Sequence, residues 1–169
     1  IDGSLSRVDA QGNLRVKTQD GVLTSQRANV LLGTQSKPQS ILLTGGVIYS
    51  SDELLRHLKG SADQARITFD SNEQPENVVF LGEVQIVERI RPAGSSEQWT
   101  SRDLTAGRVD AEFERSVPNK SQLRTVEAAG DVHLSMADEG GPTSNKATTY
   151  LSGDELVARL ASSPEIPPQ

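Results

Sequence analysis

The chain of 169 residues contains no cysteine, only two histidines and only one tryptophan. The absence of cysteine excludes disulfides, thiolate zinc sites and cysteine nucleophiles. Aromatic residues make up 4% of the chain and hydrophobic residues 34%, which are low fractions for a compact globular protein. We therefore expect a thin core of Val, Leu, Ile and Ala, of the kind that long strands form when each buries one face.

Charge and motif content argue against two further classes of function. The chain has 17 basic and 23 acidic residues and a net charge of -6, and it has no basic stripe that would suit a general nucleic-acid binder. His57 and His133 do not stand at a metal-binding spacing, and neither a nucleophile elbow nor a phosphate-binding loop occurs. We expect a protein that is not an enzyme, with no cofactor and no metal.

A short motif occurs four times: a glycine followed two residues later by an apolar residue, any residue and a second apolar residue. The copies are QGNLRV (residues 11–16), LTGGVIYS (43–50), LGEVQI (81–86) and AGDVHL (129–134). Steps of two from each glycine reach apolar side chains, because side chains alternate between the two faces of a strand. A glycine inside a strand marks a bulge or a bend, so the repeat predicts strands that all bend at the same level.

A second pattern recurs between the glycine motifs, with small or hydroxyl residues in front. We align TSQRA (residues 24–28), SADQA (61–65), TSRDL (100–104) and TTYLS (148–152), and we assign the longer third interval to a loop at 117–122. Each repeat then holds two strands joined by polar turns. Residues 50–61 and DELVARLA (154–161) also permit a short helix, although the register of the repeat favours strand, turn and strand.

The repeated Leu-x-Gly-x-Val-x-Ile strands resemble the OstA-like family of lipopolysaccharide-transport proteins. That family includes LptA, the periplasmic part of LptC and the N-terminal domain of LptD, and the sequence does not distinguish among them. The resemblance covers about residues 5–160. It is carried by the apolar pair behind each glycine: Leu14 and Val16, Val47 and Tyr49, Val84 and Ile86, Val132 and Leu134.

This resemblance implies an all-β fold: a slit-like, taco-shaped antiparallel β-jellyroll over residues 1–160, with two sheets along an apolar trough. Residues 161–169 are rich in proline, and we expect them to form a flexible tail. It also implies a periplasmic protein that holds the acyl chains of lipopolysaccharide during export to the outer membrane. Because the chain starts at Ile1 rather than Met, we expect that a signal peptide or anchor has been removed.

The resemblance further implies partners and site residues. The partners are lipid A acyl chains, other OstA-like domains joined through edge strands, and membrane proteins of the inner or outer membrane, with no nucleic acid. The trough-facing residues are Leu14, Val16, Leu43, Val47, Tyr49, Phe80, Val84, Ile86, Val132 and Leu134. Five basic residues are expected either to meet lipid phosphates at the rim or to serve solubility and the protection of strand edges: Arg7, Arg15, Lys17, Arg89 and Arg91.

One alternative belongs to another class of protein. The same aliphatic residues are compatible with a structural β-sandwich or β-solenoid that serves assembly and has a dry, closed core. On the face that is otherwise polar, Ile48 is aligned with Arg15, Gln85 and His133. We therefore expect either that a loop covers Ile48 or that it lies at a packing edge.

Overall fold

The structure is a computed structural model that describes residues 5–17, 21–91, 98–117, 120–139 and 148–159. Eight strands form one antiparallel sheet in which strand order follows chain order. Residues 161–169, the predicted tail, lie outside the described part of the chain. The strands are β1 (Arg7–Lys17), β2 (Val22–Leu32), β3 (Pro38–Glu53), β4 (Arg56–Phe69), β5 (Pro75–Ile90), β6 (Trp99–Val117), β7 (Lys120–Glu139) and β8 (Thr148–Arg159), with a 3-10 turn η1 (Thr34–Ser36) between β2 and β3.

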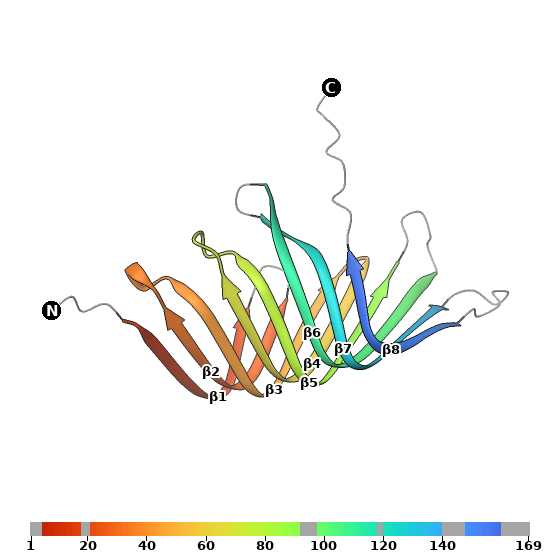
Figure 1. Ribbon diagram of the computed structural model, residues 1–169, viewed down its shortest axis with the longest axis horizontal. Coiled ribbons are helices and arrows are strands. Elements are labelled where there is room, and N and C mark those ends of the chain that lie inside the picture. Colours follow the sequence, from red (N-terminus) through yellow and green to blue (C-terminus); the bar gives the residue numbers. More distant parts are fainter. Residues whose placement is uncertain (1–4, 18–20, 92–97, 118–119, 140–147, 160–169) are drawn as a thin grey trace, which may run out of the picture.

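The sheet is folded across its strands rather than flat. Figure 1 shows each strand bending near its middle, so that two arms diverge from a common fold line. The all-β, taco-like architecture implied by the resemblance is therefore observed. The two sheets implied by the resemblance are the two arms of one continuous sheet. We call the arm that holds residues 38–44 of β3 the leading arm and the arm that holds residues 47–53 the trailing arm.

The four motif glycines lie on the fold line, as predicted. At each of them the register shifts, because two residues of an odd-numbered strand face one residue of the neighbouring strand. Gly82 has φ of +74° and Glu83 has φ of +42°, and Gly130 and Asp131 repeat this left-handed pair. These bulges bend the odd-numbered strands, β1, β3, β5 and β7.

The even-numbered strands cross the fold line differently. In β4, Ala62 and Ala65 are both buried, whereas Asp63 and Gln64 between them are both exposed. Because two consecutive side chains point outward, the alternation shifts by one residue. In β4 the inward residues are therefore even-numbered before Asp63 and odd-numbered after Gln64. The same place is occupied in the other even strands by Gln26 and Arg27, Gly107 and Arg108, and Asp154 and Glu155.

Two copies of the second sequence pattern were therefore predicted at the wrong residues. The segments equivalent to residues 24–28 and 61–65 are 105–109 and 152–156, rather than 100–104 and 148–152. The loop assigned to residues 117–122 is also wrong, because β6 runs to Val117 and β7 begins at Lys120. The longer spacing comes from the strands themselves, which have 19 and 20 residues.

The helical alternatives are excluded where the structure describes them. Leu54 and Leu55 form the turn between β3 and β4, and the backbone N–H of Arg91 donates to the Leu55 carbonyl at 2.9 Å. Near the C-terminus, residues 154–159 belong to β8. Both segments are strand and turn, as the register of the repeat favoured.

The core follows the fold line on the inner face, the face enclosed by the two arms. One buried cluster comprises Ala62, Val84, Ala106, Val109, Ala128 and Val132, and a second comprises Leu23, Leu43, Val47 and Ala65. Phe80 is half-buried and packs against both clusters. Because burial of one Val or Leu side chain contributes about 1.5–3 kcal/mol, the fold line is where this thin protein gains most of its hydrophobic stabilisation.

Candidate functional site

The predicted trough-facing residues all lie on the inner face of the folded sheet. Residues that pair across antiparallel strands share a face, and the register links these residues to one another. Leu43 pairs with Ala65, and Ala65 pairs with Phe80. On the trailing arm, Leu134 pairs with Leu104, which pairs with Ile86. The sequence therefore identified one continuous apolar face.

Burial on this face decreases away from the fold line. Leu43, Val47, Val84 and Val132 are at most 2% exposed and form the floor. Leu14, Tyr49, Phe80, Ile86 and Leu134 are half-buried, and Val16, on the edge strand β1, is 46% exposed. The flanks of the inner face therefore keep accessible apolar surface toward the space between the arms.

The two arms differ in polarity on their inner faces. On the leading arm, Ile67, Phe69 and Val78 continue the apolar face beyond Ala65 and Phe80. On the trailing arm, the inward residue after Ile86 is Glu88, and the inward residue before Leu104 is Arg102. The apolar surface of the trailing arm therefore gives way to charged groups toward its end.

Three charged side chains on neighbouring strands form this polar region. Arg56 Nε on β4 lies 2.7 Å from Glu88 Oε1 on β5, and Arg102 Nη1 on β6 lies 3.3 Å from Glu88 Oε2. The Glu88 side chain is 15% exposed, whereas each guanidinium-bearing side chain is 48% exposed. Beside this triad, the Thr100 hydroxyl donates to Asp138 Oδ1 at 3.0 Å. We call Arg56, Glu88 and Arg102 the inner triad.

The inner triad was not predicted from the sequence. Counting in steps of two from Gly82 passes Val84 and Ile86 and reaches Glu88, a carboxylate on the otherwise apolar face. This carboxylate was the one signal in the sequence. The partners of Glu88 could be found only from the strand register, which pairs Glu88 with Leu58 on β4 and with Arg102 on β6.

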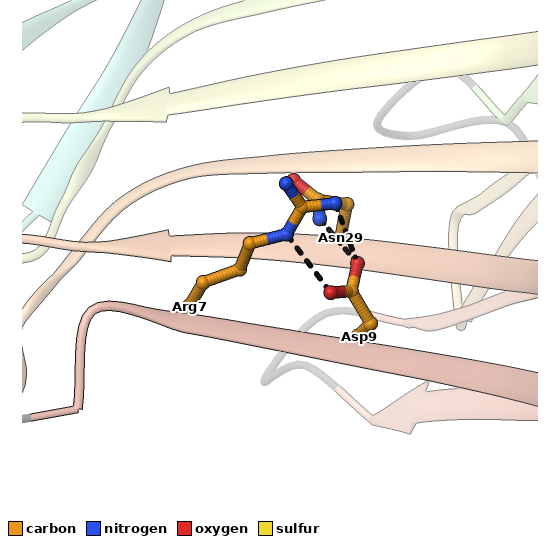
Figure 2. A network of polar contacts seen from close by, with 3 residues as sticks. All are labelled: Arg7, Asp9 and Asn29. Carbon is orange, nitrogen blue, oxygen red and sulfur yellow. Dashed lines mark hydrogen bonds and ion pairs between the residues drawn. The ribbon is translucent and has the colours of Figure 1, made fainter.

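The residues predicted for the phosphate rim lie on the outer face, opposite the apolar residues. On β1, Arg7 donates to Asp9 through two nitrogens at 2.9 and 3.0 Å, and the Asn29 amide also donates to Asp9 (Figure 2). The hydrogen bond from Arg7, followed by that from Asn29, lowers the pKa of the Asp9 carboxyl, and Asp9 in turn raises the pKa of Arg7. Arg15 and Lys17 alternate with the inward Leu14 and Val16, so they too point outward.

Arg89 and Arg91 belong to an aromatic cluster on the outer face of the trailing arm. Their guanidinium carbons lie 5.4 and 4.4 Å from the centroid of the Trp99 ring, within the range of cation–π attraction. The His57 ring lies 5.0 Å from Trp99 and contacts the Asp52 carboxylate. Arg91 Nε is buried without a hydrogen-bond partner in the described part of the chain.

Ile48 does not meet either expectation for it. It is 44% exposed on the outer face of β3, which lies between β2 and β4 inside the sheet. Among the described residues, no loop covers it and it does not lie at an edge. Ile48 is therefore an exposed apolar residue on the outer surface.

Comparison of the chain with protein-family models, with curated proteins and with solved structures found no match. Within the described ranges, no group of three or more His, Asp or Glu side chains is arranged to hold a metal ion. The described residues also contain no helix that is long and apolar enough to cross a membrane.

Proposed function

We propose that this protein is a non-enzymatic, periplasmic carrier that holds the acyl chains of lipopolysaccharide during their export to the outer membrane. The observation that supports this proposal most directly is the half-buried apolar surface that flanks the fold line inside a folded sheet. An acyl chain placed on such a surface gains about 0.8 kcal/mol for each methylene removed from water. The sequence resemblance to the OstA-like family adds the identity of the lipid.

The arrangement of the sheet suits a long, flexible ligand. Phe80 packs against both buried clusters, so the apolar floor continues from β2 to β8 without interruption by a charged side chain. Dispersion and desolvation act along the whole length of an acyl chain and do not require a single deep pocket. A carrier that transfers its ligand benefits from this kind of distributed contact.

Photo-crosslinking tests the proposal with matched pairs on adjacent positions. A photoreactive amino acid replaces the half-buried inward residues Tyr49 and Ile86 in one pair of variants, and the outward Ile48 and Val87 in the control pair. We expect adducts with lipopolysaccharide from the inward positions and few from the outward ones. Equal adduct yields at both faces, or no adduct at any position, would contradict the carrier function.

A second candidate is an assembly module that joins copies of itself or related domains. In the part of the chain that the structure describes, β1 pairs with β2 alone and β8 with β7 alone, so each has one free edge. Free edges offer backbone N–H and C=O groups for β-augmentation. Sedimentation velocity over a range of protein concentrations tests this candidate, which requires a rising sedimentation coefficient without added lipid.

A further inference from the structure

We infer that the inner triad binds the head group of a phosphorylated glycolipid, while the acyl chains of the same molecule lie along the fold line and the leading arm. The inference rests on the proposed carrier function and adds to it a head-group site and a fixed orientation of the ligand. It stands on the difference in polarity between the two arms.

The placement of the triad on the inner face is the first argument. Glu88 is two residues beyond Ile86 in β5, and Arg102 is two residues before Leu104 in β6, so both continue the face that carries the apolar floor. The leading arm has Ile67 and Val78 at a comparable distance from its own buried residues. An amphiphile between the arms therefore meets a polar surface on one side only, and this selects one of its two orientations.

The composition of the triad is the second argument. One carboxylate, Glu88, is shared by two guanidinium groups, so the triad carries a net positive charge. Each guanidinium has five N–H donors in a planar fork that matches phosphate geometry, and the hydrogen bonds to Glu88 use one nitrogen of each. Both arginines are 48% exposed and therefore accessible to a ligand on the inner face.

The surrounding acids favour a head group that also carries hydroxyl groups. Asp138 accepts a hydrogen bond from Thr100 beside Arg102, and Glu53 pairs in register with Arg56 at the end of β3. Carboxylates accept hydrogen bonds from sugar hydroxyls, whereas arginines donate hydrogen bonds to phosphate. A rim with both arginines and acids fits a phosphorylated sugar better than a purely anionic group.

The spacing of the arginines fits one head group. Arg56 and Arg102 lie on β4 and β6, and adjacent strands are about 4.8 Å apart, so their backbones are separated by about 10 Å. The side chains nevertheless converge, because both guanidiniums contact the Glu88 carboxylate, at 2.7 and 3.3 Å, so their remaining N–H donors can contact one sugar-phosphate group. The triad therefore offers one position for the head group on the trailing arm.

The test compares three probes on the full chain: lipid A, the same lipid with its phosphates removed, and a glucosamine phosphate without acyl chains. The double variant R56Q/R102Q removes the two inner charges. The matched control R15Q/R66Q removes two charges from exposed arginines of the outer face. We expect R56Q/R102Q to bind lipid A about tenfold more weakly and the control to bind it as the unaltered chain does, because charge-assisted hydrogen bonds to phosphate are lost only in the former.

A second variant distinguishes the loss of head-group binding from the loss of folding. The change R56Q/R102Q leaves Glu88 unpaired in a largely buried position, so R56Q/E88Q/R102Q is measured in parallel with thermal unfolding of both variants. Both variants should lose the preference for phosphorylated over dephosphorylated lipid. The inference is overturned if that preference survives in the triple variant, or if the outer-face control loses it equally.

The outcomes separate the head-group site from the carrier function. If the unaltered chain binds both lipids equally and the variants bind them as well, the carrier function stands and the head-group site is wrong. If the unaltered chain binds neither lipid, both proposals are wrong. If glucosamine phosphate binds as tightly as lipid A, the triad is a site for a free sugar phosphate, and the inferred lipid orientation is overturned.

Discussion

On the fold line, Gly82 of β5 lies against the side chain of Asp63 of the neighbouring strand β4, so closely that a Cβ atom at residue 82 would be 2.2 Å from Asp63 Oδ2 and 3.0 Å from Asp63 Cβ. Gly45 and Gln26 repeat this relationship on β3 and β2, where the corresponding Cβ–Cβ distance would be 2.8 Å. Both glycines also have left-handed backbone angles, with φ of +74° and +82°. The bend therefore requires glycine for space and for conformation.

The substitution Gly82→Ala should destabilise the protein by about 2–3 kcal/mol, because it combines an unfavourable positive φ with displacement of Asp63. Urea unfolding measures the change. Gly60→Ala is the matched control: Gly60 lies within β4, and its added Cβ would meet its nearest neighbour, the Gln85 carbonyl oxygen, at 3.9 Å. We expect G60A to be neutral or slightly stabilising. Equal stability of the two variants would contradict this account of the bend.

Truncation of two apolar residues of β3 should change the stability of the protein by very different amounts. Leu43 is 2% exposed in the second buried cluster, so Leu43→Ala should cost about 2–5 kcal/mol of unfolding free energy. Ile48 is 44% exposed on the outer face, so Ile48→Ala should change stability by less than about 1 kcal/mol. Thermal or urea unfolding of both variants decides the matter. A large loss at Ile48 would show that the outer face of β3 is covered.

The Asp9 carboxyl should titrate at a lower pH than an ordinary aspartate, because Arg7 and Asn29 hydrogen-bond to its charged form (Figure 2). Since its pKa is lowered on folding, its contribution to stability is present above the unfolded-state pKa of about 3.9 and is lost as the pH falls through the folded-state value. Carbon-13 NMR of the carboxyl measures the pKa. Arg7→Gln should return it toward the ordinary value, whereas Arg15→Gln on the same strand should leave it unchanged.

The Arg91→Met substitution tests the aromatic cluster on the outer face. The Arg91 guanidinium carbon lies 4.4 Å from the Trp99 ring centroid, so its loss should cost about 0.5–1 kcal/mol. Trp99 is the one tryptophan in the sequence, so its emission reports directly on this contact. We expect a change in emission for R91M and none for the control R15M. An unchanged spectrum in R91M would argue against the contact with Trp99 in solution.

Local rules were sufficient to predict the inner apolar face and the level of the bend. The alternation through Val84 and Ile86, and the tolerance of Gly82 for positive φ, are properties of one strand at a time. The parity change at Asp63 and Gln64 was not predicted, because it depends on the neighbouring strand having one residue more at the bulge. The third and fourth copies of the second sequence pattern, which were aligned by their leading hydroxyl residues, were therefore placed at the wrong residues.

The candidate site was also predicted only in part from the sequence. Its floor consists of residues whose hydrophobicity and spacing are visible in the sequence. The inner triad was missed because Arg56, Glu88 and Arg102 are far apart in the chain and meet only through the register of three strands. Conversely, Arg89 and Arg91 were expected at the rim, although their parity relative to Val84 places them on the outer face.

Because the strands pair in chain order, the fold line becomes longer with each strand that is added to the sheet. In the described part of the chain, successive hairpins are bonded to one another in chain order, so a further hairpin at either end adds two strands without altering existing pairs. At about 4.8 Å per strand, one such duplication lengthens the enclosed surface by about 10 Å. The length of the enclosed surface in this architecture therefore changes in steps of one two-strand unit, whereas the position of the glycine within each odd-numbered strand separately sets the depth of the two arms.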